Sequence, residues 1–355
     1  MKWSFQLMRI AGIDVRVHAT FFLLLAWFGT VYFLEGGYGA MVIGLSFIIL
    51  LFACVVLHEF GHALAARAYG INTPDITLLP IGGIARLERM PDKPWQELVV
   101  ALAGPAVNVV IAFGLYIVIG RFFGLGDLEE LAEGRGNLLT QLLAINVILV
   151  VFNLLPAFPM DGGRVLRALL ATRLSHARAT RIAAAVGQTV AVLFGLLGLF
   201  GGNPFLLFIA VFVFFGARAE ANFATFKETA EGTRVAAVMH PTGPVLTKGM
   251  TVSEAVQTAM QGHDGALPVA DSSLHLVGMI PADTLARALR WDPTAKIDRM
   301  VRDDFAAIIA DASLSQAVGI MRQSAQAAFP VVNAGGQLVG MLKREDVEHA
   351  FGQGA

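Results

Sequence analysis

Long runs of apolar residues alternate with short polar segments over the first 220 positions. Six runs lie near residues 18–34, 39–66, 97–120, 138–159, 182–200 and 204–218. Each is about long enough to cross a bilayer core as a helix, which takes roughly 17 to 25 residues. The pattern predicts a polytopic α-helical membrane protein with six transmembrane helices, the first being an uncleaved span and not a signal peptide.

A segment between the second and third runs follows a different pattern. The stretch INTPDITLLPIGGIARLERM, residues 71–90, combines brief apolar runs with two prolines and with Gly82 and Gly83 at its centre. It is too polar to cross a membrane and too apolar for an ordinary loop. These features predict a membrane-associated β-hairpin.

The chain changes character after about residue 219, where a soluble pattern begins. Two segments repeat there at a spacing of 62 residues: TVSEAV from Thr251 matches SLSQAV from Ser313, and LVGMI from Leu276 matches LVGML from Leu338. Each unit predicts a helix, a strand, a turn, a strand and a helix. We expect a transmembrane domain over 1–220, a linker over 221–234, and two α/β modules over 235–293 and 294–355.

Composition supports a membrane location and excludes several classes of protein. The mean hydropathy is +0.65, and 56% of the residues are hydrophobic, well above a soluble domain. The net charge of -1 gives no support for nucleic acid binding. The single cysteine, Cys54, excludes an intrachain disulfide and a multi-cysteine metal cluster.

Charge near the spans predicts their orientation. Twelve lysines and arginines fall on one side of the predicted membrane, against Arg121 and Arg135 on the other. Positive residues favour the cytoplasmic side. We therefore expect a multi-pass protein of the inner (cytoplasmic) membrane with both termini in the cytoplasm.

The stretch VVLHEFGHALAARAYG, residues 55–70, places ionisable residues at the end of the second run. His58 and His62 are four apart, so on a helix they share one face and can hold one metal ion. Glu59 lies beside them, where it can polarise a metal-bound water. Ionisable groups at that depth cost about 2.5 to 3.5 kcal/mol each and are seldom kept without a function. The HExxH pattern thus indicates a zinc hydrolase.

A catalytic zinc needs a third protein ligand, and we expect it in NVILVVFNLLPAFPMDGGR, residues 146–164. Asp161 is the best candidate, because two prolines interrupt the span and Gly162 and Gly163 let the backbone come close. The alternative is that Asp161 only caps the helix that follows. Cys54, one turn before His58, is expected to be a small buried hydrophobe and not a ligand.

HEFGH together with NLLPAFPMDGG resembles the site-2 protease family of intramembrane zinc metalloproteases, over about residues 1–220. The resemblance implies one zinc ion per chain held by His58, His62 and Asp161, with Glu59 as the general base. It also implies that Asn153 binds the substrate backbone or orients the site. The alternative for Asn153 is a buried asparagine bonded to a neighbouring helix.

Two further segments match that family. Gly82 and Gly83 match its membrane-dipping loop, which implies that they bind substrate by presenting a strand edge to an unwound segment. LAGPAVN, residues 102–108, matches its third span. There we expect Gly104 and Asn108 to serve helix packing.

The carboxy-terminal repeat resembles a pair of CBS modules, over roughly residues 235–350. The resemblance implies an adenosine nucleotide between the modules, contacted by a hydroxyl residue and an aspartate after the last strand. The second module keeps the aspartate as Asp346 but has Lys343 at the hydroxyl position; the first has Pro281 and Thr284. The alternative is a dimerising or gating module without a ligand, with a homodimer formed through the CBS modules.

Taken together, these features predict an intramembrane protease that cleaves transmembrane segments of membrane-anchored proteins. The resemblance to the site-2 protease family implies single-span regulators such as anti-sigma factors, or signal peptide remnants, as its substrates. The CBS modules would modulate access, and the implied partners are a membrane-protein substrate and the lipid bilayer, with no nucleic acid. The rival interpretation is a CBS-regulated ion transporter or channel whose intramembrane acids and histidines line an ion path. Replacing Glu59 by glutamine separates the two, since a transporter changes flux whereas a protease loses cleavage and keeps its metal.

Overall fold

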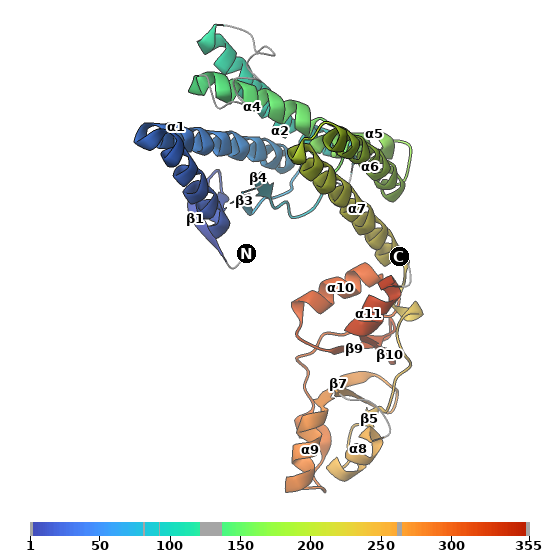
Figure 1. Ribbon diagram of the computed structural model, residues 1–355. Coiled ribbons are helices and arrows are strands. Elements are labelled where there is room, and N and C mark those ends of the chain that lie inside the picture. Colours follow the sequence, from blue (N-terminus) through green and yellow to red (C-terminus); the bar gives the residue numbers. More distant parts are fainter. Residues whose placement is uncertain (1–2, 81, 92, 121–136, 261–264, 353–355) are drawn as a thin grey trace. The chain divides into compact units, whose positions relative to one another are not determined.

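The computed structural model describes residues 3–80, 82–91, 93–120, 137–260 and 265–352. They form two compact units, Met1–Ala224 and Thr225–Ala355, the first mainly helical and the second α/β (Figure 1). Three of the charges used to predict the orientation, Lys2, Arg121 and Arg135, lie outside the described residues.

Long apolar helices make up most of the first unit. They are α1 (Ala19–Ala68), α2 (Pro94–Ile119), α4 (Leu138–Asn153), α5 (Asp161–Ala171), α6 (His176–Phe200) and α7 (Pro204–Gly232), whose last residues belong to the second unit. Four of them, α1, α2, α6 and α7, are long and apolar enough to cross a membrane, whereas α4 has only 16 residues. Large side chains such as Val118 and Phe200 are 71% and 84% exposed, as expected where a helix faces lipid. The predicted helical membrane protein is confirmed; the number of six spans stays a prediction.

The helix α1 bends sharply at Gly36 and Gly37, where the backbone leaves helical geometry. Gly37 has a φ of 70°, a conformation that favours glycine. The two arms of α1, drawn in blue in Figure 1, fold back on each other. Phe21 packs on Phe52 with ring centroids 4.6 Å apart. The first two predicted runs correspond to these two arms.

A four-stranded sheet packs against α1. Its strands, in spatial order, are β1 (Ser4–Ile10), β2 (Ile13–His18), β3 (Asp75–Leu79) and β4 (Gly82–Ala85). The pair β2–β3 is parallel, and the pairs β1–β2 and β3–β4 are antiparallel. Ile13, Val15 and Ile76 pack on Phe60 and Ala63 of α1, which anchors the sheet on the turn that carries HEFGH.

The predicted hairpin is confirmed as β3–β4, and its association with the membrane stays a prediction. The strands β1 and β2 were not predicted. The strand β4 forms one edge of the sheet, so half of its backbone groups have no neighbouring strand.

A buried ion cluster fixes α5 against its neighbours. Arg167 is 2% exposed; its Nε donates to Glu97 Oε1 of α2 at 2.7 Å and its Nη1 to Glu220 Oε1 of α7 at 2.5 Å. The guanidinium also lies 5.1 Å from the centre of the Phe158 ring. Arg167 is one of the twelve positive residues assigned to the cytoplasmic side, but its burial makes it a structural ion-pair partner. The cluster orients the helix that begins at Asp161.

The second unit contains one α/β module twice. Its elements are η1 (Val235–Ala237), β5 (Leu246–Thr247), α8 (Val252–Ala259), β6 (Ala266–Ala270), β7 (Leu276–Pro281), α9 (Ala282–Trp291), η2 (Ile297–Met300), β8 (Ile308–Ile309), α10 (Leu314–Gln323), β9 (Ala328–Val332), β10 (Leu338–Lys343) and α11 (Arg344–Gly352). Each three-stranded sheet has one parallel and one antiparallel pair. Thr251 and Ser313 each begin a helix with a capping box. The predicted repeat is confirmed; the short strands β5 and β8 and the short helices η1 and η2 were not predicted.

Candidate active site

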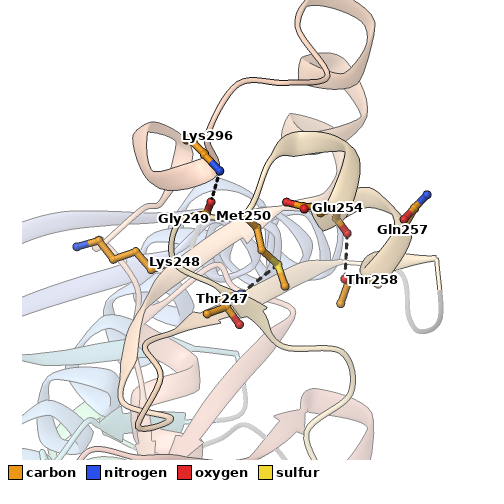
Figure 2. Close-up of a pocket in the computed structure, with 8 residues that line it drawn as sticks. All are labelled: Thr247, Lys248, Gly249, Met250, Glu254, Gln257, Thr258 and Lys296. Carbon is orange, nitrogen blue, oxygen red and sulfur yellow. Dashed lines mark hydrogen bonds between the residues drawn. The ribbon is translucent and has the colours of Figure 1, made fainter.

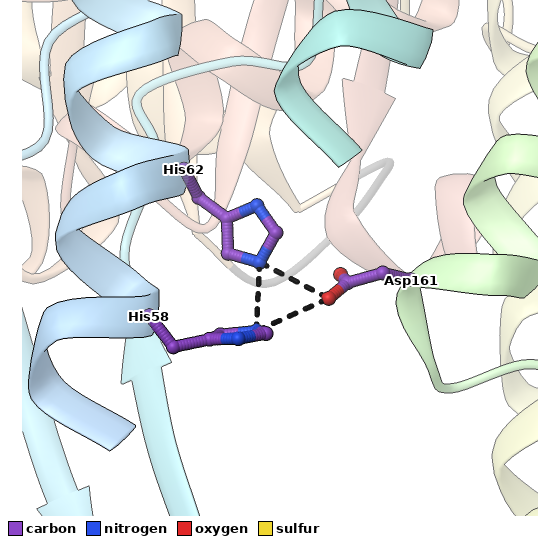
Figure 3. A group of neighbouring side chains, drawn as sticks. All are labelled: His58, His62 and Asp161. Atoms are coloured by element: carbon purple, nitrogen blue, oxygen red, sulfur yellow. Dashed lines mark hydrogen bonds and ion pairs between the residues drawn. The ribbon is translucent and has the colours of Figure 1, made fainter. Parts of the chain in front are cut away.

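Three side chains from two helices meet inside the first unit. His58 and His62 lie one turn apart on α1, and Asp161 is the first residue of α5 (Figure 3). The two Nε2 atoms are 3.1 Å apart, and Asp161 Oδ2 lies 3.2 Å from His58 Nε2 and 3.1 Å from His62 Nε2. All three residues are buried. The N-cap of α5 is Met160, so Asp161 is not the cap that the alternative interpretation required.

The triangle has the dimensions and the chemistry of a metal site. Two atoms bound about 2.1 Å from a tetrahedral zinc ion lie about 3.4 Å apart, close to the observed separations. His58 Nδ1 lies 2.5 Å from Asn108 Oδ1, and His62 Nδ1 lies 2.7 Å from the Val100 carbonyl oxygen. Both partners are acceptors, so in the neutral rings the protons sit on Nδ1. Three lone pairs then converge, an arrangement that a bound cation satisfies.

Gly104 of α2 makes room for the two rings. A Cβ atom at this position would meet the imidazoles of both His58 and His62. Gly61 has the reciprocal role on α1, since a Cβ there would lie 2.6 Å from the Ala103 carbonyl oxygen. We expected Gly104 and Asn108 to serve helix packing. The structure places both directly against the histidines.

Glu59 lies beside this triangle and under the edge of the sheet. Its Oε2 accepts a hydrogen bond from the Ala85 N–H at 3.2 Å. Gly83 packs so closely that a Cβ would lie 2.8 Å from Glu59 Cγ. Since the Arg86 N–H points back to β3, the N–H groups of Ala85 and Gly83 face the opposite way, toward the free edge of β4. The carboxylate therefore sits where an added strand would run.

One cavity of about 410 Å³ joins these groups. Its lining includes every candidate residue predicted in the membrane unit: His58, Glu59, His62, Asn153, Asp161, Gly82 and Gly83. Arg164, which was not predicted, also lines it, and its Nη1 lies 3.8 Å from Asp161 Oδ1. Asn153 is the last residue of α4 and lines this cavity.

Three functional candidates were missed because their roles depend on packing between distant segments. They are Asn108 and Asn146, which form a buried hydrogen bond behind His58, and the backbone N–H of Ala85. The motif LAGPAVN gives a sequence signal for Asn108, which is a polar residue among small ones. It gives no signal for Asn146, the residue to which Asn108 donates. Cys54 is buried, as expected, and its Sγ lies 3.4 Å from Asn146 Nδ2.

The predicted nucleotide contact, Asp346, is already engaged in the second unit. Its Oδ2 accepts from the Lys343 N–H at 2.8 Å, and its Oδ1 lies 2.7 Å from His240 Nε2. The adjacent hollow, lined in part by His240 and Lys343, has a volume of about 80 Å³, small against the 300 Å³ or more of a typical ligand site.

A larger, open hollow of about 690 Å³ is lined by residues of the first module and by Lys296 from the segment that follows it (Figure 2). Its lining residues are Thr247, Lys248, Gly249, Met250, Glu254, Gln257, Thr258 and Lys296. Lys296 Nζ donates to the Gly249 carbonyl oxygen at 2.6 Å. None of the positions compared for nucleotide binding, Pro281, Thr284, Lys343 and Asp346, lines this hollow.

Known proteins resemble both units of the chain. The model for peptidase family M50 matches residues 46–135 and 127–197, and the CBS domain model matches 235–290 and 297–352. A zinc metalloprotease of Methanocaldococcus jannaschii is 31% identical over 361 residues, covering 99% of this chain and 97% of that protein. Stage IV sporulation protein FB of Bacillus subtilis is 28% identical over 136 residues, covering 38% and 44%. Among solved structures, the site-2 protease from Methanocaldococcus jannaschii is 38% identical, with a TM-score of 0.46, over 62% of this chain and 95% of that chain.

Proposed function

The chain belongs to peptidase family M50, the zinc metalloproteases of the site-2 type, and carries two CBS domains; on this premise we propose that its zinc ion is held by His58, His62 and Asp161. The convergence of their three ligand atoms within 3.2 Å carries the proposal. Zinc held there would supply a Lewis acid that lowers the pKa of a water molecule to about 7.

Glu59 acts as the general base in this proposal. Its carboxylate takes a proton from the attacking water and delivers it to the nitrogen of the leaving amine. The hydrogen bond from the Ala85 N–H holds the carboxylate at the rim of the cavity. Asp161 is charge-complementary to the nearby Arg164, which supports its assignment as a ligand in the ionised form.

The substrate binds as an extended strand along the free edge of β4. A helical transmembrane segment hides its peptide bonds in internal hydrogen bonds, so it must be unwound before hydrolysis. Backbone groups of Gly83 face the free edge, and pairing with them would lay the unwound peptide over Glu59. Gly83 would thus pair with the substrate backbone, and we propose Gly82 and Asn153, which line the same cavity, as further substrate-binding residues. The substrates are single-span membrane proteins such as anti-sigma factors or signal peptide remnants.

The remaining assignments follow the same premise. We place both termini in the cytoplasm of a cell whose inner membrane the chain crosses six times, with the two arms of α1 counted separately. The protease domain spans 1–220, the linker 221–234, and the CBS modules 235–293 and 294–355. The modules modulate access, with an adenosine nucleotide as the ligand and a homodimer as the assembly. The ion transporter alternative loses its support, because the family is one of peptidases.

The test combines zinc content with cleavage, both measured on detergent-purified protein and on vesicles holding a panel of single-span substrates. We expect one zinc per chain in the parent and in E59Q, and loss of zinc in H58A and D161A. E59Q should cleave about 10²- to 10⁴-fold more slowly, the usual contribution of a general base. The matched control is E35Q, which makes the same change at an exposed glutamate of α1 and should alter neither quantity. Parental zinc in H58A and D161A, or parental cleavage by E59Q, would contradict the assignment.

A further inference from the structure

The imidazole of His58 is hydrogen bonded on the side away from the proposed zinc position, and its partner is a buried amide. His58 Nδ1 lies 2.5 Å from Asn108 Oδ1, Asn108 Nδ2 donates to Asn146 Oδ1 at 2.8 Å, and Asn146 Nδ2 donates to the Leu142 carbonyl oxygen at 2.8 Å. Both asparagines are 0% exposed. One line of hydrogen bonds therefore runs from a backbone carbonyl of α4, across α2, to a ring on α1.

The donors and acceptors in this line of hydrogen bonds can be assigned in only one way. A carbonyl oxygen can only accept, so Asn146 must turn its Nδ2 toward Leu142 and its Oδ1 toward Asn108. Asn108 must then donate to Asn146 and present its own Oδ1 to His58. A neutral imidazole facing that oxygen carries its proton on Nδ1 and leaves Nε2 with a free lone pair.

We propose that Asn108 and Asn146 are positioning residues that fix the tautomer of His58 and thereby its capacity to bind zinc. The inference rests on the proposed function, because it assumes that His58 is a zinc ligand. Partners behind a metal-bound histidine commonly set its tautomer and ring orientation. Here Asn146 orients the Asn108 amide, and that amide fixes the tautomer of His58. Asn146 therefore acts on a zinc ligand that it does not contact.

A comparison with His62 shows why His58 needs the two asparagines. His62 Nδ1 meets the Val100 carbonyl oxygen directly at 2.7 Å, so the backbone alone fixes its tautomer. His58 Nδ1 meets the Asn108 amide instead, and an amide side chain can present either its oxygen or its nitrogen. If Asn146 is removed, the Asn108 amide can rotate and turn Nδ2 toward His58. The proton of the ring then moves to Nε2, where it blocks the metal.

The experiment measures the zinc dissociation constant of the full chain in detergent by competition with a chromophoric chelator. N108A should bind zinc about 10- to 100-fold more weakly than the parent. N146A should bind about three- to tenfold more weakly, the value of one hydrogen bond. Because Asn146 acts only through Asn108, N108A/N146A should match N108A within about twofold.

A rescue variant separates positioning from packing. Aspartate has two equivalent acceptors and needs no orienting partner, so N108D/N146A should bind zinc at least about fivefold more tightly than N108A/N146A. The matched control is T180A, which removes the side-chain hydrogen bond of another fully buried residue in the same unit and should leave zinc binding unchanged. The absorption spectrum of the cobalt(II)-loaded parent and N146A gives a second readout, since a changed ligand shifts its bands.

The outcomes distinguish a failure of the proposed function from a failure of the inference about Asn108 and Asn146. A parent that binds no zinc overturns the proposed function and the inference with it. A parent that binds zinc, with parental affinity in N108A, overturns the inference alone. Additive losses in N108A/N146A, or no rescue by aspartate, also overturn it, because they indicate two independent packing effects. If N108A does not fold, the comparison of N146A with the parent and T180A decides in the same way.

Discussion

Gly104 is the position at which one added methyl group most directly tests the zinc site. A Cβ atom there would lie 2.7 Å from His58 Nε2 and would collide with the His62 ring. An ordinary contact begins at 3.4 Å, so the His58 ring would have to retreat by about 0.7 Å, whereas zinc–ligand distances tolerate only about 0.2 Å. G104A is therefore expected to lose a histidine ligand, and its zinc affinity should fall by more than the roughly 100-fold that a lost supporting hydrogen bond can cost.

The same helix offers a matched control. At Gly114 an added Cβ meets nothing within 4 Å, so G114A makes the same chemical change away from the site. Alanine is also a better helix former than glycine by up to about 1 kcal/mol, which means that neither variant should weaken α2. The assay is zinc affinity by chelator competition, with the thermal midpoint of each variant measured alongside. Parental zinc affinity in G104A would refute the reasoning, because the imidazoles could not then lie against α2; equal losses in both variants would show a general effect of the methyl group.

Three other variants test other parts of the structure. G83V would push a side chain into Glu59 Cγ, 2.8 Å from its Cβ, so cleavage should fall about 10- to 100-fold while zinc content stays at the parental value; unchanged cleavage would contradict the placement of β4. R167M leaves the buried Glu97 carboxylate and the partly exposed Glu220 carboxylate without the Arg167 cation and should lower stability by about 3 to 5 kcal/mol, seen as a lower thermal midpoint in detergent; an unchanged midpoint would mean that the cluster contributes nothing. Hydrogen bonds from the Thr251 N–H and hydroxyl lower the pKa of Glu254 below its ordinary value of 4.5. Its contribution to stability is therefore present above pH 4.5 and is lost as the pH falls through the lowered pKa, so acid-induced pepsin cleavage near α8 should depend less steeply on pH in E254Q than in the parent.

Local patterns in the sequence were enough to identify the three residues that converge at the candidate metal site. The spacing of His58 and His62 translates directly into one helix face, and the glycines after Asp161 mark a close backbone approach. The structure bears out the latter, since a Cβ at Gly163 would lie 2.6 Å from the Phe158 nitrogen. Such features can be predicted from the sequence because they depend on residues only a few positions apart.

Features that depend on long-range packing were not visible in the sequence. Asn108 meets His58 across 50 positions, and nothing in either segment specifies the helix crossing that joins them. Arg167 reads as a loop charge, because only the fold supplies its buried partners. The strand Ile13–His18 alternates apolar and polar residues and could have been recognised, but its charges also fit a positive flank before a span. The number of membrane crossings could not be predicted from length and apolarity, because these do not fix how the short helix α4 lies.

The proposed ligands come from two separate helices, α1 and α5, and this links the metal to folding. In the unfolded chain, Asp161 is about a hundred positions away from the histidines, so zinc binds mainly to the folded state. A ligand with that preference stabilises the fold by mass action, by about 2.7 kcal/mol at a free concentration one hundred times its dissociation constant. Zinc shortage would then reduce the amount of folded protease as well as its activity, and a variant with weak zinc binding could be lost to degradation before its catalytic defect is seen.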